Sequence, residues 1–141
     1  MRQYLKSISI VTLLLLTCWH AKAQEALLVD TIGATNRYSA MIELPKAYLS
    51  GVCIMKTDGQ GVVKGCLFNE FGISALEFTY RPGDKKVKLL NVIQMMNKWY
   101  IKRIISRDLA KVYQQLLEGN TTYRNEKYHI TYKFTPLKSE E

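Results

Sequence analysis

The residue types that most often do chemistry are few in this chain and widely separated. The chain has two histidines, His20 and His129, and three cysteines, Cys18, Cys53 and Cys66. A nucleophilic site needs Ser, Cys or Thr beside a base that a third group orients, and nothing in the sequence places such a partner next to His129. The local alternation puts His129 on the polar face of a late strand, where a solvated histidine is the simpler interpretation. We therefore predict no catalytic residue and a protein that is not an enzyme.

Metal and cofactor chemistry find equally little support. One histidine and two cysteines thirteen positions apart match no zinc-binding spacing. The acids Glu70, Glu77, Asp84 and Asp108 form no array for calcium and single out no pair for glycoside hydrolysis. The glycines of segment 59–65 superficially resemble a dinucleotide fingerprint, but pyrophosphate binding needs a helix N-terminus and this segment leads into a strand. We predict no metal and no cofactor.

One segment, which is both basic and aromatic, does suggest a binding function. Lys98, Lys102 and Arg103 are interleaved with Trp99 and Tyr100. This mixture is typical of a helix that rests on an anionic membrane surface. An ordinary amphipathic helix, with one face in the core and a solvated lysine face, has the same composition, so both interpretations stay open. The residues predicted to face a membrane or an acidic partner are Lys98, Lys102, Arg103 and Arg107.

The elements that must position these residues begin as strands. Segment 37–44 alternates in polarity and ends at Pro45, which cannot donate to a strand ladder. Segments 51–56 and 62–69 flank the glycine-rich turn 58–61 and predict a hairpin. A turn centred between residues 59 and 60 places Cys53 directly opposite Cys66. A disulfide between them is one interpretation, and two buried free thiols are the other.

The stretch from Phe68 to Tyr80 is predicted as the central strand, with a bend or bulge at Gly72. Leu76, Phe78 and Tyr80 share one of its faces, as a half-buried strand requires. The turn 81–84 then leads into a partner strand over 86–92.

Helical periodicity follows the strands. We predict one helix over 93–105 and a second helix over 106–117 with Ser106 as its N-cap. Strands return at 121–123 and 128–135, and the segment before residue 37 is expected to be loosely held.

The first 23 residues have the pattern of a secretory signal peptide. Arg2 and Lys6 precede a short apolar run that ends at Trp19, and small residues at 21 and 23 predict cleavage before Gln24. Thr17-Cys18 has the outline of a lipobox, which makes lipidation at Cys18 an alternative. The full chain carries a net charge of +8, and loss of Arg2, Lys6 and Lys22 would leave +5 on one α+β domain over 24–141. This moderate charge favours anionic surfaces rather than nucleic acid.

Three segments of the chain are similar to segments of known protein families: 68–80, 86–93 and the predicted helix that contains Asn97-Lys-Trp-Tyr-Ile-Lys-Arg103. Over roughly residues 50–110 the chain resembles small uncharacterised exported proteins of Bacteroidota and is similar to the periplasmic lipoprotein-sorting (LolA/LolB-like) families. That similarity implies a strongly curved sheet, an incomplete barrel, with helices closing its mouth around a cavity for acyl chains. This chain is shorter, so the resemblance implies a smaller cavity.

Together these observations predict a curved antiparallel sheet of about six or seven strands with two helices on its concave side. We expect an exported protein of the periplasm or outer-membrane periphery. Our first functional interpretation is binding of a lipid or a lipoprotein acyl chain. The second is a structural or interaction protein that contacts an anionic membrane or an acidic partner through its basic helix. The side chains expected to line or gate an apolar pocket are Phe71, Leu76, Phe78, Tyr80, Trp99 and Tyr100.

Overall fold

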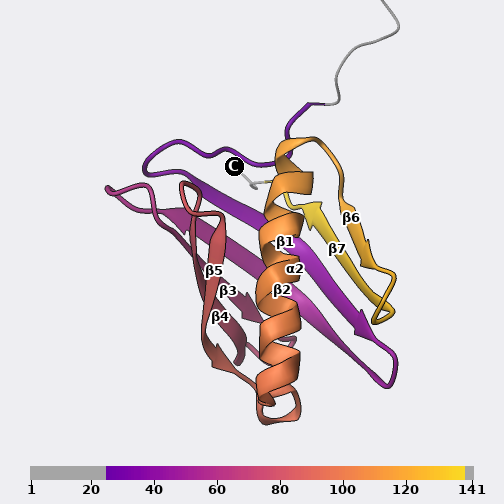
Figure 1. The fold of residues 1–141 in the computed structure, drawn as a ribbon. Helices are drawn as coiled ribbons and strands as arrows, with labels where there is room; N and C mark the ends of the chain where they lie inside the picture. The colour runs from indigo at the N-terminus through magenta and orange to yellow at the C-terminus, as the bar shows by residue number, and fades with distance from the viewer. Residues whose placement is uncertain (1–24, 139–141) are drawn as a thin grey trace, which may run out of the picture.

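The computed structural model describes residues 25–138, which form one antiparallel sheet, a 3-10 turn and one α-helix (Figure 1). The strand order in the sheet is β5-β4-β3-β2-β1-β7-β6. The expected signal peptide and Cys18 lie outside the described residues. The elements are β1 (Thr35–Leu44), β2 (Ala47–Thr57), β3 (Val63–Phe68), β4 (Ser74–Arg81), β5 (Lys86–Val92), η1 (Gln94–Met96), α2 (Trp99–Leu117), β6 (Thr122–Asn125) and β7 (Ile130–Pro136).

The predicted curved antiparallel sheet is confirmed, whereas the prediction of two helices is wrong. Residues 94–96 form only the short turn η1, and Lys98 is extended, with φ −119° and ψ 137°. From Trp99 the helix runs without a break through Ser106, which does not cap a second helix. The Ser106 hydroxyl instead donates a hydrogen bond to the Val87 carbonyl of β5. No glycine or proline separates the two predicted helices, so nothing in the backbone ends the first one.

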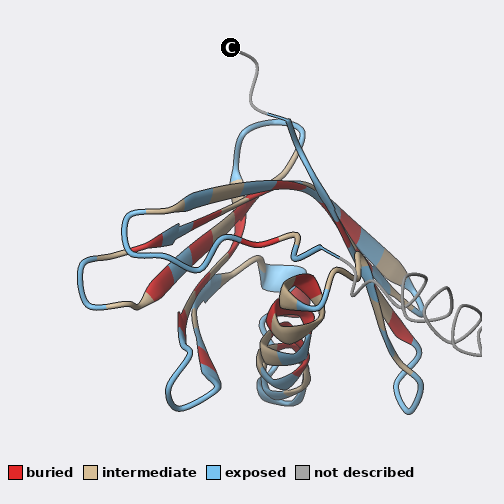
Figure 2. Ribbon diagram, turned by 90° about the horizontal axis from the view of Figure 1, so that it is seen from above, coloured by how far each residue is buried: buried red, intermediate tan, exposed pale blue. Residues whose placement is uncertain are grey.

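The sheet curls around α2, which lies inside its concavity (Figure 2). Two register shifts help it to curl: Ala75 is left out of the β3–β4 pairing and Leu90 out of the β4–β5 pairing. Extra residues of this kind bend a strand and increase its twist. Gly65 adds a close contact, because the Phe78 ring lies where a Cβ on residue 65 would be. Among the strands, α2 makes its closest backbone approaches to β5 and β6, the two edges of the sheet.

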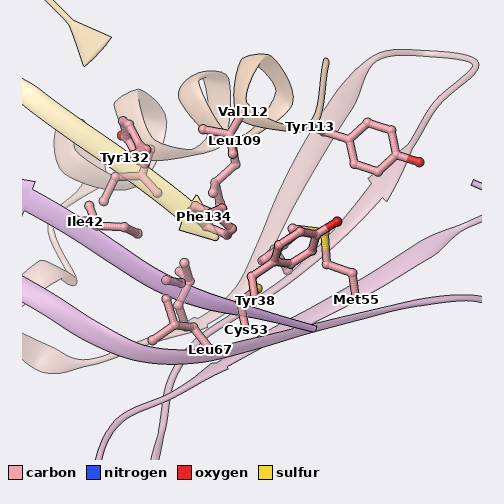
Figure 3. Packing of buried hydrophobic residues seen from close by; sticks show 14 of the residues in the cluster. Tyr38, Ile42, Cys53, Met55, Leu67, Leu109, Val112, Tyr113, Tyr132 and Phe134 are labelled. Carbon is pink, nitrogen blue, oxygen red and sulfur yellow. The ribbon is translucent and has the colours of Figure 1, made fainter. Parts of the chain in front are cut away.

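One apolar core fills the space between the concave face and α2 (Figure 3). From the helix come Ile105, Leu109, Val112, Tyr113 and Leu116, which recur at helical spacing. The sheet contributes alternate residues of each strand, as a face buried on one side requires. The fully or nearly fully buried sheet residues are Tyr38, Ala40, Ile42, Leu49, Cys53, Met55, Val63, Leu67, Ala75, Leu76, Phe78, Tyr80, Val87, Ile130, Tyr132 and Phe134.

The N-terminal segment is held against the C-terminal end of α2, so the expectation of a loose segment is wrong from Leu27 onward. The Leu27 amide donates to the Leu116 carbonyl at 2.8 Å, and Tyr38 Oη donates to the Leu27 carbonyl at 2.9 Å. Leu28 is buried beside them. At the opposite end of the helix, Met96 of η1 is also buried, so the core is covered at both ends.

The stretch 68–80 is not one bent strand, because the chain reverses at Asn69–Ile73. The Asn69 side-chain oxygen accepts from the amides of Phe71 and Ile73, both at 3.0 Å, and Gly72 has φ 74°. Only glycine adopts such a φ without strain. The β2–β3 turn has the same construction around Asp58 Oδ1, which accepts from the amides of Gln60 and Val62. The pattern Asx-x-x-Gly therefore signals a hairpin turn at both places.

The predicted alignment of the two cysteines is wrong by one residue. Thr57 pairs with Val63, so the β2–β3 loop is centred on Gln60, and Cys53 lies opposite Leu67 rather than Cys66. Cys53 is buried on the concave face, whereas Cys66 pairs with Ile54 on the other face. Both cysteines are free. Neighbouring positions of a strand point to opposite faces, which separates the two thiols and disfavours a disulfide.

Candidate functional site

Of the six residues predicted to line an apolar pocket, three are buried in the core and three are exposed on the surface. Leu76, Phe78 and Tyr80 are buried in the core, beneath the apolar face of α2. Phe71 lies at the tip of the β3–β4 turn and is 79% exposed. The remaining two, Trp99 and Tyr100, are exposed on the first turn of α2 and contact each other edge to face, with 5.8 Å between ring centroids.

The four residues predicted to face a membrane or partner lie together near the start of α2. Lys98 precedes the helix, and Lys102, Arg103 and Arg107 follow within its first nine residues. Lys98, Arg103 and Arg107 are exposed, while Lys102 is half-buried toward β5. Lys111, one turn beyond Arg107, extends the exposed row along the face that points away from the sheet. We call Lys98, Lys102, Arg103, Arg107 and Lys111 the basic face.

These cations are not neutralised by neighbours. The single ion pair within residues 25–138 joins Arg124 to Glu126, at 3.2 Å, and no residue of the basic face takes part in it. The side chains of the basic face also make no hydrogen bond among the described residues. Lys85 and Lys86, in the β4–β5 turn and at the start of β5, add positive charge beside the helix. Asp84 borders the hollow on that side of the helix, and Glu126 borders the hollow on the other.

Three open hollows follow the basic face. The first, about 650 Å³ in volume, includes Lys86, Val87, Arg107 and Ala110. The second, about 480 Å³, lies between α2 and the β6–β7 hairpin. The third, about 510 Å³, lies between α2, β4 and β5. Arg103 borders all three, so an anion that approaches from any of these sides meets the same guanidinium.

A buried carboxylate fixes α2 against the last hairpin. Asp108 is 2% exposed, and it accepts from Tyr132 Oη at 2.7 Å and from Asn125 Nδ2, which lies 3.0 Å from each carboxylate oxygen. Burial raises the pKa of Tyr132, and the hydrogen bond to Asp108 raises it further, so this phenol remains a neutral donor. The network has a structural role, because it joins the helix to β6 and β7 and holds one end of the basic face in place.

The described residues offer no alternative centre for metal chemistry. They contain no group of three or more His, Cys, Asp or Glu side chains that could hold a metal ion. His129 lies in the β6–β7 turn with φ 54°, not within a strand as predicted, and it is exposed. No helix in residues 25–138 is long and apolar enough to cross a bilayer.

Sequence reasoning missed Lys111, Lys85 and Asp108. Lys111 carried a usable signal, since it lies four residues after Arg107 and eight after Arg103, which puts all three on one helix face. In the sequence Asp108 is one of several scattered acids without an assigned role, whereas in the structure it belongs to the inner face of α2 with Ile105. Its partners lie in a later hairpin, so no local pattern shows them.

A comparison of the chain with protein-family models, curated proteins and solved structures finds no match.

Proposed function

We propose that this protein binds an anionic lipid surface through the basic face of α2, as an exported protein of the cell envelope. The observation that carries the proposal is the row of cations that no acid neutralises in the described structure. Cations that serve only folding or solubility are usually mixed with acids on the same face. Here the first turns of α2 contain no acidic residue, and Asp108 is turned inward.

The size of the effect is sufficient for reversible binding. Each lysine or arginine near an anionic leaflet contributes about 1 kcal/mol. Lys98, Lys102 and Arg103, at the start of the helix, would together contribute about 3 kcal/mol before the loss of translational freedom is counted, so the binding is expected to weaken as salt is added. Trp99 and Tyr100 lie among these cations and are side chains that favour the membrane interface.

The interpretation as a carrier of lipid chains has weaker support. A carrier would present Leu76, Phe78 and Tyr80 to its ligand, whereas these residues pack under the helix in a core that includes Val112 and Leu116. To admit an acyl chain, α2 would have to leave the concave face together with its buried Asp108 network.

The test is the binding of a chain that begins at Gln24 to lipid vesicles. Such a chain contains the whole sheet, the helix and the core. We expect it to sediment with vesicles containing about one quarter phosphatidylglycerol, to bind pure phosphatidylcholine weakly, and to dissociate as the screening length falls from about 10 Å at 0.1 M salt to about 3 Å at 1 M.

A matched pair of charge-reversal variants separates a specific face from net charge. The triple variant Lys98→Glu, Lys102→Glu, Arg103→Glu should lower affinity by at least about 100-fold, since three attractive contributions of about 1 kcal/mol are lost and three repulsive charges are added. The control Arg37→Glu, Lys56→Glu, Lys64→Glu makes the same charge change at exposed positions of β1, β2 and β3 and should have a much smaller effect. Equal losses in the two variants, or binding indifferent to phosphatidylglycerol, would contradict the proposal.

A further inference from the structure

The two ends of the sheet differ sharply in the side chains that they expose. In an antiparallel meander, successive turns alternate between the ends. The β1–β2, β3–β4 and β6–β7 turns therefore lie at the same end as η1 and the start of α2, the lower end in Figure 1. We call this the aromatic end. Its exposed apolar side chains are Tyr48, Phe71, Ile73, Met95, Trp99, Tyr100 and Tyr128.

These seven are the majority of the twelve large hydrophobic side chains that the described residues expose, and they include every exposed aromatic one. Phe71 is 79% exposed, Trp99 73% and Tyr48 67%. The opposite end has the β2–β3 turn, the β4–β5 turn and the α2–β6 loop, whose residues are mainly polar or glycine. Its exposed large hydrophobic residues are the aliphatic Val29, Ile32 and Leu137.

Folding does not require Phe71 to be aromatic. The β2–β3 and β3–β4 turns share the Asx-x-x-Gly construction, with the same hydrogen bonds to the Asx side chain. Gln60 occupies in the first turn the position that Phe71 occupies in the second. The same loop geometry therefore forms with a polar residue, and the exposed phenyl ring has no structural purpose within residues 25–138.

Four separate chain segments expose these side chains at one end of the sheet. Side chains spread over so many segments are better suited to contact an extended apolar surface than to enclose a small ligand. Lys46 in the β1–β2 turn, Lys98 before α2 and Lys127 in the β6–β7 turn are all exposed at this end, together with Glu70 and Glu126 in two of its turns. Trp and Tyr favour the interfacial region of bilayers, and adjacent lysines favour anionic lipid.

We infer that the aromatic end inserts into the interfacial region of an anionic membrane, with the axis of α2 steep to its surface. This inference rests on the proposed function and specifies its orientation. Lys98, Lys102 and Arg103 then lie at the level of the headgroups. Arg107 and Lys111, about 12 and 18 Å along the helix from Trp99, stand farther out.

The first experiment uses Trp99 as a depth probe. In a chain that begins at Gln24 it is the single tryptophan. On vesicles of phosphatidylcholine with about one quarter phosphatidylglycerol, we expect its emission to shift to the blue and to be quenched by lipids brominated on the acyl chain near the headgroup.

The second experiment compares apolar residues at the two ends. Phe71→Gln should lower vesicle affinity by about tenfold, and the loss should persist at high salt because it removes apolar rather than electrostatic binding. Ile32→Ser, which removes an exposed apolar side chain at the opposite end, is the matched control and should leave affinity unchanged. Urea unfolding of both variants confirms that the fold is retained.

The outcomes distinguish this inference from the proposed function. No binding to anionic vesicles at low salt overturns both. Salt-sensitive binding without a Trp99 shift, with Phe71→Gln equal to the unsubstituted chain, overturns insertion and leaves surface binding intact. A dimer in sedimentation experiments that Phe71→Gln dissociates would show that the aromatic end joins two copies of the chain, which also overturns insertion.

Discussion

At the scale of single residues, Asp108 is the most deeply buried charged side chain in the described structure. A carboxylate withdrawn from water is costly unless hydrogen bonds replace its hydration. Tyr132 Oη and Asn125 Nδ2 supply those bonds from the last hairpin, at 2.7 and 3.0 Å. The helix therefore keeps its acid on the inner face, while the outer face of its first turns carries no acidic residue.

Asp108→Ala should lower the free energy of unfolding by about 2–3 kcal/mol, because it leaves Tyr132 Oη and Asn125 without their charged acceptor. Urea denaturation measures this loss. Tyr132→Phe alone should cost less, since Asn125 still satisfies the carboxylate. Adding Tyr132→Phe to Asp108→Ala should cause little further loss, because the hydroxyl has then no acceptor to lose. Fully additive losses would show that the two groups are not coupled.

The two cysteines of the described structure have different environments. Burial raises the pKa of the Cys53 thiol from 9.0 to about 12, with a smaller contribution from Cys66. The folded state thus favours the protonated thiol. Its contribution to stability is fully present below pH 9.0 and is lost as the pH rises toward 12.

In a chain that begins at Gln24, N-ethylmaleimide at pH 8 should modify Cys66 and leave Cys53 unmodified until the protein unfolds. The thiolate is the reactive form, and Cys53 is both buried and protonated. Mass spectrometry before and after addition of urea gives the count of modified thiols. A native protein in which neither thiol reacts, and which gains two hydrogens on reduction, would instead have the disulfide that the β2–β3 register disfavours.

At the scale of elements, the β3–β4 hairpin sets the curvature of the sheet. Ala75 is extra in the pairing of β4 with β3, and the Phe78 ring lies over Gly65 of β3. A Cβ at residue 65 would lie 2.2 Å from the end of the Phe78 ring. This contact lets a large aromatic side chain fill the core at the point where the sheet turns toward α2.

Gly65→Ala should therefore destabilise the protein by about 1–3 kcal/mol through overpacking. Gly59→Ala is the matched control, since Gly59 has open space around its Cβ position and should tolerate alanine. Both are measured by urea denaturation. Adding Phe78→Leu to Gly65→Ala should recover part of the loss. A Gly65→Ala protein as stable as the Gly59→Ala control would contradict the packing of Phe78 on this glycine.

At the scale of the whole molecule, the single helix α2 fills the concave side of the sheet, where two helices were expected. It covers the concave face, approaches both edges of the sheet and presents its basic face outward. The N-terminal segment and Met96 cover the core at opposite ends. The outside of α2 and the aromatic end, the two surfaces that we propose bind lipid, meet at Trp99.

Local patterns in the sequence were sufficient for the β2–β3 and β4–β5 hairpins and the basic segment, but not for the chain reversals between β1 and β2 and between β3 and β4. Alternation identified β1, β4 and β7 because each buries one face only, and Leu76, Phe78 and Tyr80 are indeed on the buried side. The helical spacing of Leu109, Val112 and Leu116 was equally informative. The cations at 98, 102, 103 and 107 could be found from spacing alone, since helix geometry fixes which of them share a face.

Only the tertiary structure decided the rest. Whether Ser106 caps a helix or bonds to β5 depends on a strand that packs against it, and the position of Cys66 depends on a loop one residue longer than expected. The partners of Asp108 come from a hairpin that begins fourteen residues later. The gathering of Phe71, Trp99 and Tyr48 at one end follows from the alternation of turns across the whole sheet. No short segment contains that information, because it resides in the order in which the strands pair.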